Sequence, residues 1–369
     1  MDQLYLHKLS LVNFKNYAHA DVTFSERFNC IVGNNGEGKT NLLDAIHYLS
    51  FTKSYFNPID SQNVYHDAPM FVIQGEFKSD KKENEVYCAQ KRGERKQIRV
   101  NKKEVTRFAD HIGLFPVVMT TPSDVELILE GSEIRRKFTD SIISQYDRHY
   151  LESIINYTKV LLQRNAHLKQ LSKSGKFDSE SLKIWDVQLV GLGNKIFRKR
   201  KEFSTEFEPI FQKYYGLISG ANEKVGIAYQ SQLGKDDFEA LLNEAQDKDK
   251  VMEYTTVGIH KDDWEFRIDN YPAKKFASQG QQKSYILAIK LAQFEFVKLH
   301  RQIIPILMLD DIHDKLDEQR VKRLIELVST NDFGQLFITN TSKDLIQKLF
   351  KGINTEVKIF KVKNGSISV

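Results

Sequence analysis

The sequence lacks the features that mark secreted and membrane-spanning proteins. Only two of its 369 residues are cysteines, Cys30 and Cys88, which is too few for a framework of disulfides and favours a reducing compartment. No apolar stretch approaches the roughly 20 residues that a membrane-spanning helix needs. The first residues alternate in polarity and include Asp2, unlike a signal peptide. We therefore expect a cytoplasmic protein with no membrane partner.

A strong charge of either sign is also missing overall, since the net charge is only +5. A net charge this small is by itself no evidence for a nucleic-acid partner. The distribution is uneven, however, because residues 81–107 contain ten Lys or Arg against four Glu, a local net charge of +6. Alternating segments at 85–90 and 96–105 flank Arg92-Gly93 and predict a β-hairpin.

Two interpretations of the hairpin cations stand side by side. They can form a track for DNA phosphates, or they can be lysines that guard an edge strand against aggregation. The candidate DNA-contacting residues are Lys91, Arg92, Arg95, Lys96, Arg99, Lys102 and Lys103.

The first clear functional signal is a glycine-rich segment at residues 33–40, which has the form G-x-x-x-x-G-K-[ST]. An apolar run at 28–32 precedes it and a helical stripe follows it, which is the strand–loop–helix context that a phosphate-binding loop requires. The glycines let backbone N–H groups turn inward, and the helix N-terminus adds partial positive charge. Lys39 is the candidate for the β- and γ-phosphates and for catalysis, and Thr40 is the candidate Mg²⁺ ligand. The nucleotide-binding residues predicted here are Gly33, Asn34, Asn35, Gly36, Glu37, Gly38, Lys39, Thr40 and Asn41.

A second half of the same site is predicted from the apolar run 303–309, which ends at Asp310-Asp311. Two adjacent carboxylates at the end of a buried strand require a counter-charge, and Mg²⁺ supplies one. We assign Asp310 to the metal and Asp311 to the polarisation of the attacking water. The alternative is a solvated turn after a core strand. Together the two segments predict hydrolysis of a nucleoside triphosphate.

A third segment opens a helical pattern at Ser278-Gln279-Gly280-Gln281. A small polar cluster at a helix N-terminus can bind an anion. It can also be an ordinary helix cap, with Ser278 as the capping residue. Taken alone, the segment favours the ordinary cap.

These segments, in this order, resemble the ABC-type ATPases, with a D-loop-like stretch at 315–317. Within that class the chain is similar to the RecF family of bacterial recombination mediators. The resemblance is carried by residues 9–17, 33–46, 131–138 with Asp140, and 258–263 leading into 278–281. It implies an α/β fold, an ABC-type P-loop ATPase head with an inserted compact helical arm and no long coiled coil.

The resemblance also implies a function. It implies a head-to-tail dimer that sandwiches ATP, with Ser278, Gly280 and Gln281 of one subunit reaching the γ-phosphate bound by the other. It implies a weak, DNA-stimulated ATPase that binds DNA at gaps and single-strand/double-strand junctions. Its partners would be DNA, a second copy of the chain, and RecR.

The chain departs from the family pattern at several positions. Ile259 and Lys261 stand where the family often has Pro and Arg, and Lys lacks the planar fork that grips phosphate. Val118 falls at the expected Q-loop glutamine, and Asn340-Thr341 fall where transporter ATPases place a switch histidine. His313, just after the acidic pair, is interpreted as incidental.

The predicted organisation has three parts. Residues 1–121 form the N-terminal part of the head, 122–250 the helical arm, and 251–369 the C-terminal part of the head. Helices are expected at about 124–130, 132–171, 179–217 and 235–247.

Two basic clusters in the arm are left open. Arg135-Arg136 can face nucleotide, DNA or an acidic partner in the core. The run 198–201 can be a solvated helix face or a DNA contact.

Three other functions compete with the recombination mediator. A transporter-type ABC ATPase subunit would need a lobe that couples to a permease. An ATPase of a nuclease system would need a further metal-binding carboxylate cluster, for which Asp262-Asp263 beside His260 is the spare pair. A nucleotide-gated scaffold would need no DNA role.

Overall fold

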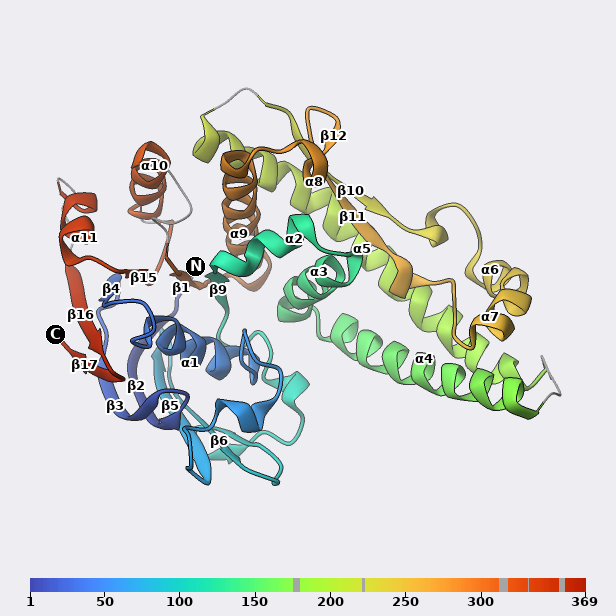
Figure 1. Ribbon diagram of the computed structural model, residues 1–369, viewed down its shortest axis with the longest axis horizontal. Helices are drawn as coiled ribbons and strands as arrows, with labels where there is room; N and C mark the ends of the chain where they lie inside the picture. The colour runs from blue at the N-terminus through green and yellow to red at the C-terminus, as the bar shows by residue number, and fades with distance from the viewer. Residues whose placement is uncertain (175–179, 221–222, 312–317, 331, 352–355) are drawn as a thin grey trace. The chain divides into compact units, whose positions relative to one another are not determined.

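The computed structural model describes residues 1–174, 180–220, 223–311, 318–330, 332–351 and 356–369. The chain separates into two compact units (Figure 1). The head comprises Met1–Val125, Lys213–Ala221 and Ser278–Val369, and the arm comprises Glu126–Gln212 and Asn222–Ala277. No helix in the described part of the chain is long and apolar enough to cross a membrane.

One sheet of the head is mostly parallel and has the strand order β17-β16-β4-β15-β14-β9. All neighbours are parallel except the edge pair β16 and β17. Every residue of β4, β14, β15 and β9 is buried, as expected for a parallel sheet covered on both faces. The strands are β4 (Phe28–Val32), β9 (Val117–Thr120), β14 (Ile306–Leu309), β15 (Leu336–Asn340), β16 (Val357–Lys363) and β17 (Ser366–Ser368).

The second sheet of the head is antiparallel, with the order β3-β2-β5-β6-β7-β8. The predicted hairpin is confirmed, because β6 pairs with β7 with Cys88 opposite Ile98. The second arm of the hairpin is divided, since Asn101 and Lys102 have positive φ and form a tight turn before β8. The strands are β2 (Tyr5–Phe14), β3 (Tyr17–Thr23), β5 (Met70–Lys78), β6 (Glu83–Lys91), β7 (Gln97–Val100) and β8 (Lys103–Glu104).

The core of the head lies around helix α1 (Lys39–Phe51), which contacts strands of both sheets. Apolar side chains of α1, such as Leu42, Ile46 and Leu49, form one buried cluster with residues from the two sheets. This packing fixes the start of α1 at the carboxyl end of β4. The other head elements are β1 (Asp2–Gln3), β13 (Ile303–Ile304), α9 (Gln279–Arg301), α10 (Glu318–Val328) and α11 (Lys343–Leu349).

The arm is helical with one small sheet, β10-β11-β12. Its long helices α4 and α5 run side by side (Figure 1) and are joined by an ion pair between Arg164 and Asp186. The longest helix, α5, has 37 residues, so the expected absence of a long coiled coil is confirmed. The elements are α2 (Glu126–Leu129), α3 (Ser132–Tyr146), α4 (Arg148–Ser174), α5 (Lys183–Ser219), α6 (Phe238–Glu244), α7 (Gln246–Met252), α8 (Ala273–Phe276), β10 (Val225–Gln230), β11 (Asp263–Ile268) and β12 (Tyr271–Pro272).

Two expected helices are each divided in two. The helix expected at 132–171 breaks at Asp147, which is extended and accepts the backbone N–H of Tyr150, so it caps α4. The helix expected at 235–247 begins at the cap Asp237 and is divided between α6 and α7.

The boundary between arm and head also differs from the expected residue 250. Residues 251–277 belong to the arm, because β11 pairs with β10 and Asp262 forms an ion pair with Arg200.

Candidate functional site: a nucleotide site at the carboxyl edge of the parallel sheet

The predicted phosphate loop lies between β4 and α1, where the sequence placed it. The Gly33 N–H donates to the Asn340 carbonyl at 3.2 Å, which ties the loop to the end of β15. A Cβ at Gly33 would lie 2.3 Å from the Val362 carbonyl oxygen, so a side chain cannot be accommodated there. Gly38 caps α1 with φ of 117°, a conformation that favours glycine. Gly36 also has a positive φ, of 83°, so backbone contact or dihedral angle explains all three glycines.

The turn between β2 and β3 braces the outer side of the loop. The Tyr17 hydroxyl donates to the Gly38 carbonyl at 2.9 Å, and the Asn16 amide donates to the Glu37 carbonyl at 2.9 Å. The Asn41 amide in turn donates to Asn16 Oδ1 at 2.8 Å. Asn16 and Tyr17 were part of a recognised stretch, but the sequence did not indicate this structural role.

Lys39 is buried, with its ammonium group directed back over the loop. Its Nζ donates to the carbonyls of Gly33 at 2.8 Å and Asn34 at 3.0 Å. The ammonium group is therefore held in place by two carbonyl groups of the phosphate loop itself. A cation in this position can neutralise a phosphate that the loop amides bind.

Thr40 and Asp310 meet although 270 residues separate them. The Thr40 hydroxyl donates to both carboxylate oxygens of Asp310, at 3.1 and 2.9 Å. Asp310 is itself buried, and its backbone N–H donates to the Thr120 carbonyl at 2.8 Å. The two predicted metal ligands are thus brought together by parallel pairing, which aligns the ends of neighbouring strands.

Thr339 organises the acidic pair, a role that the sequence did not reveal. Its hydroxyl donates to Asp310 Oδ1 at 2.6 Å and accepts the Asp311 N–H at 2.8 Å. Thr339 is fully buried in β15, beside β14. Asp311 lies just after the end of β14 with φ of 47°, and the hydrogen bond from its N–H to Thr339 holds it there.

The donor set fits a hydrated Mg²⁺. The hydroxyl of Thr40 and the carboxylate of Asp310 are hard oxygen donors in hydrogen-bonding contact, and Mg²⁺ prefers one or two such ligands together with phosphate oxygens. The buried carboxylate of Asp310 accepts hydrogen bonds from the hydroxyls of Thr40 and Thr339. A cation bound at this point would supply a counter-charge to the buried carboxylate.

The Ser278 segment forms a helix cap. The Ser278 hydroxyl accepts the Gln281 N–H at 3.2 Å and the Gln281 side chain accepts the Ser278 N–H at 2.7 Å, a complete capping box. Arg320 braces the same turn, donating to the Gly280 carbonyl at 2.7 Å and to Ser284 Oγ at 2.8 Å. The ordinary cap is therefore present, and a further role toward nucleotide stays a prediction.

Val118 falls at the position where the family pattern leads us to expect a Q-loop glutamine. Val118 lies within β9, opposite Leu307, and its side chain is fully buried. The residue level with the end of β14 is Thr120. Asn340 uses its side chain to accept the Ser342 N–H at 2.9 Å and its carbonyl to hold Gly33. His313 and the D-loop-like residues 315–317 lie outside the described residues.

A largely buried series of ion pairs and hydrogen bonds connects α1, the helix that follows the phosphate loop, with α9. Asp44 of α1 pairs with Lys15 at 2.6 Å and accepts the Tyr55 N–H at 2.6 Å. The Tyr55 hydroxyl donates to Asp124, which pairs with Lys290 of α9 at 2.8 Å. Asp124 thereby holds α9 beside the loop that follows α1.

The hairpin places most of its cations in solvent, with one exception. Lys91, Arg92, Arg95, Arg99, Lys102 and Lys103 are exposed. The Lys96 side chain is only 9% exposed, because its ammonium pairs with Asp60 at 2.7 Å and lies over the rings of Tyr48 and Phe108. Lys96 is therefore a structural cation and leaves the set of candidate DNA contacts.

Arg135 and Arg136 face acidic and carbonyl partners inside the arm. Arg135 makes two parallel hydrogen bonds to the carboxylate of Asp263, at 2.7 and 3.0 Å. Arg136 donates to the Asp262 carbonyl at 2.7 Å. Of the three alternatives left open, the structure supports the core partner.

The basic run 198–201 is divided between surface and core. Arg200 is buried and pairs with Asp140 at 3.0 Å and with Asp262 at 2.8 Å. Arg198 and Lys201 are exposed. The run is therefore not a uniform solvated face, because Arg200 is buried in the arm core, and a DNA contact by the exposed cations stays a prediction.

Comparison with known proteins agrees with this geometry. The RecF/RecN/SMC N-terminal domain family matches residues 5–368. The DNA replication and repair protein RecF of Flavobacterium johnsoniae is 48% identical over 357 residues, covering 97% of this chain and 99% of that protein. The chain belongs to the RecF family. A second relative of the same name, from Phocaeicola vulgatus, is 47% identical and covers 98% of each chain.

Solved structures support the same family and fold. A structure of the recombination mediator protein RecF-ATP in the RecFOR pathway superposes with a TM-score of 0.89 at 29% identity, covering 99% of this chain and 97% of that one. The RecF-ATPrS structure gives a TM-score of 0.88 at 30% identity, with coverage of 99% and 98%. The Smc head domain of Pyrococcus furiosus, at 19% identity and a TM-score of 0.56, shares the fold. The expected fold class is thereby confirmed.

Proposed function

We propose that this RecF-family chain is an ATP-dependent DNA-binding recombination mediator, which acts at gaps and single-strand/double-strand junctions. The convergence of Lys39, Thr40 and Asp310 at one sheet edge carries the ATP part of the proposal. The relatives' names, which place RecF in DNA replication and repair and in the RecFOR pathway, support the mediator part. RecR is the partner proposed from the family resemblance.

The described residues can divide the work of hydrolysis among them. The loop amides and the ammonium of Lys39 would hold the β- and γ-phosphates, and Thr40 and Asp310 would hold Mg²⁺, which supplies charge neutralisation on the phosphates when bound. Asp311, positioned by Thr339, would orient the attacking water. We propose that the protein hydrolyses ATP weakly and slowly, because it acts as a switch between two states.

We further propose that ATP joins two copies head to tail. The cap at Ser278, Gly280 and Gln281 has its backbone fixed by the capping box and by Arg320. Such a rigid helix N-terminus could meet the γ-phosphate bound by a second subunit without reorganisation. Closure of this dimer would bring the β6–β7 hairpins of both subunits to one DNA molecule. The coupling is reciprocal, so DNA would tighten ATP binding by the factor by which ATP tightens DNA binding.

Sedimentation of the purified chain tests this proposal directly. With ATP, Mg²⁺ and a gapped duplex, we expect the wild type to sediment as a dimer bound to DNA, and without ATP to lose that species. Lys39→Arg keeps the charge but changes the shape of the cation, so we expect nucleotide-dependent DNA binding to weaken at least tenfold, or about 1.4 kcal/mol. A monomer at saturating ATP and DNA, or wild-type binding by Lys39→Arg, would contradict the scheme.

The hairpin has its own test. Lys102 and Lys103 lie at the turn between β7 and β8 and are exposed. If both contact phosphate, the variant Lys102→Glu/Lys103→Glu should bind DNA more weakly and lower the salt slope of log K by about two. Lys343→Glu/Lys351→Glu, which reverses two exposed lysines elsewhere on the head, is the matched control. Equal losses in both variants would indicate general repulsion and remove the hairpin from the proposal.

The two competing ATPase functions are less well supported. For the nuclease-system ATPase, the spare pair Asp262-Asp263 is already bound by Arg200, Arg136 and Arg135. His260 bonds Tyr157 and the Thr255 carbonyl, and no cluster of three potential metal ligands occurs within the described ranges. For the transporter-type ABC ATPase subunit, 48% identity to a RecF protein over nearly the whole chain favours the mediator instead.

A further inference from the structure

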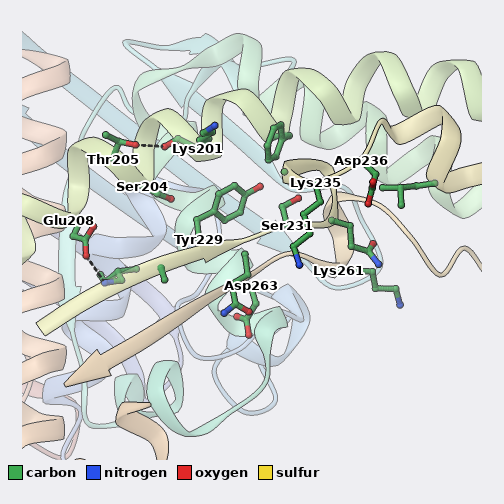
Figure 2. Close-up of a pocket in the computed structure, with 17 residues that line it drawn as sticks. Lys201, Ser204, Thr205, Glu208, Tyr229, Ser231, Lys235, Asp236, Lys261 and Asp263 are labelled. Atoms are coloured by element: carbon green, nitrogen blue, oxygen red, sulfur yellow. Dashed lines mark hydrogen bonds between the residues drawn. The ribbon is translucent and has the colours of Figure 1, made fainter. Parts of the chain in front are cut away.

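A groove of about 1020 Å³ runs through the arm between α5 and β10 (Figure 2). One wall is a face of α5 with Lys201, Thr205 and Glu208 at helical spacing, and the other includes residues 227–230 of β10. Lys235 and Lys261 lie at one end. All lining residues belong to the arm.

Strand β10 is an edge strand, and the groove runs along its free edge. In the sheet order β10-β11-β12, β11 is the one strand that pairs with β10 within the described residues. The Ile227 N–H donates to Glu208 Oε1 at 3.2 Å and the Val225 carbonyl accepts from Gln212 Nε2 at 3.0 Å. Because backbone groups alternate between the two sides of an antiparallel strand, residues 225, 227 and 229 direct theirs away from β11.

The free edge is covered over one half and open over the other. Side chains of α5 occupy the outward groups at Val225 and the N–H of Ile227. The Ile227 carbonyl and both backbone groups of Tyr229 have no hydrogen-bond partner among the residues that the structure describes. An open stretch of strand edge presents a template for another strand, which proteins usually block.

The charges in the groove are unbalanced toward positive. Lys201, Lys235 and Lys261 line it, and none forms an ion pair with a carboxylate in the described part of the chain. Of the three lining carboxylates, Asp263 is neutralised by Arg135, whereas Glu208 accepts only the neutral Ile227 N–H and keeps its charge. Glu208 and Asp236 therefore face three ammonium groups, which leaves an excess of one positive charge.

We propose that this groove binds an extended acidic peptide segment of a partner protein, which adds as a strand to the open edge of β10. The open backbone groups at residues 227 and 229 would pair with the peptide backbone. Acidic side chains at alternate positions of the peptide would meet the ammonium groups of Lys201, Lys235 and Lys261.

A nucleic-acid strand suits the groove less well. Single-stranded nucleic acid is bound by a basic groove that follows the backbone together with free aromatic rings on which the bases stack. The two aromatic rings of the lining, Phe197 and Tyr229, lie beside each other with centroids 6.0 Å apart. The Tyr229 ring is stacked on Trp264 with centroids 4.8 Å apart, and its hydroxyl is bound to Asp262 at 2.6 Å. The ring is therefore committed to the arm core, while the backbone edge beside it is open.

The test begins with display selection of random 12-residue peptides on the full-length chain. Selected sequences are made as fluorescein-labelled peptides, and binding is followed by fluorescence anisotropy. We expect enrichment of Asp and Glu alternating with β-branched residues. N-methylation of alternate backbone amides in the peptide should raise Kd at least tenfold, because it removes the strand pairing.

Variants of the chain locate the binding. Lys201→Glu/Lys235→Glu should raise Kd at least tenfold, and Thr205→Trp, which fills the groove, should abolish binding. Lys195→Glu reverses an exposed lysine of the same helix outside the groove and should leave Kd unchanged. If Thr205→Trp does not fold, the two exposed lysine reversals decide the matter.

Three outcomes would overturn the proposal. The first is a selection that returns no acidic strand-forming peptides, and the second is peptides whose Kd is the same for wild type and the lysine-reversal variant. The third is competition, in which unlabelled oligo(dT) displaces the peptides and itself binds more weakly to the same variants. That result would assign the groove to nucleic acid. None of these outcomes bears on ATP-driven dimerisation, which is measured separately.

Discussion

At the scale of single residues, the nucleotide site depends on one hydroxyl that no motif contains. Thr339 donates to Asp310 and accepts from the N–H of Asp311, so it fixes both members of the acidic pair. It is fully buried, and water cannot replace the hydroxyl if the side chain is changed. One oxygen atom, the hydroxyl of Thr339, therefore positions both the proposed metal ligand and the proposed water-orienting residue.

Thr339→Val tests this role. The substitution keeps the volume and removes the hydroxyl, leaving Asp310 and the Asp311 N–H each without one partner. We expect the free energy of unfolding to fall by about 1–3 kcal/mol and ATP hydrolysis to slow. Urea unfolding and phosphate release measure the two effects. Thr339→Ser, which restores the hydroxyl, should recover most of both, and an equal loss in Ser and Val would show that the methyl group matters instead.

At the scale of elements, one four-residue run of α5 shows how a helix distributes its charges. Arg198 and Lys201 point to solvent, while Arg200 is inserted among α3, α4 and the segment before β11. It bonds Asp140, the Tyr150 hydroxyl and the Ile259 carbonyl as well as Asp262. The single guanidinium joins four segments of the arm, and its partners are spread over 123 positions of the sequence, from 140 to 262.

Arg200→Met tests the importance of this junction. Removal of one partner leaves Asp140 and Asp262 as poorly compensated carboxylates, of which Asp262 is fully buried. Loss of one member of a buried ion pair typically costs about 3–5 kcal/mol, so we expect the arm to unfold at lower denaturant concentration. Arg198→Met is the matched exposed control and should change stability by less than about 0.5 kcal/mol. Similar values for the two variants would argue against the junction.

At the scale of the whole molecule, each unit contains a histidine whose surroundings keep it neutral. Burial lowers the pKa of His47 in the head to about 4, from the ordinary 6.5. Burial likewise lowers the pKa of His260 in the arm to about 4. Because the unfolded chain takes up these protons first, each histidine stabilises its unit above pH 6.5, and this contribution is lost as the pH falls from 6.5 toward 4.

The pH dependence can be assigned by substitution. We expect stability to decrease between pH 7 and pH 5, with His47 contributing roughly 2 kcal/mol to the decrease. His47→Phe cannot take up the proton, so the difference between urea unfolding at the two pH values should shrink by that amount. The exposed His149 gives the control His149→Phe, which should leave the pH dependence unchanged. A wild-type pH dependence in His47→Phe would mean that this ring does not titrate on unfolding.

Much of the nucleotide site follows from local sequence. The spacing of Gly33, Gly38, Lys39 and Thr40, and the apolar run ending at Asp310, predicted a strand, a loop, a helix and an acidic strand end that the structure contains. These features are local because a glycine turn, a helix start and a buried strand each depend on a few neighbouring residues. The hairpin of β6 and β7 was predictable for the same reason.

Other side chains could be assigned only from the fold. Lys96 and Arg200 look like surface cations in the sequence, yet each is buried against a carboxylate at least 36 positions away. Thr339 and Asn16 act on the nucleotide site because β15 and the β2–β3 turn are packed beside it. By itself the sequence determined which strands and turns can form and which groups can bind phosphate. Only the tertiary structure decided which charges are in solvent and which are paired, because burial and long-range pairing depend on segments that local pattern does not connect.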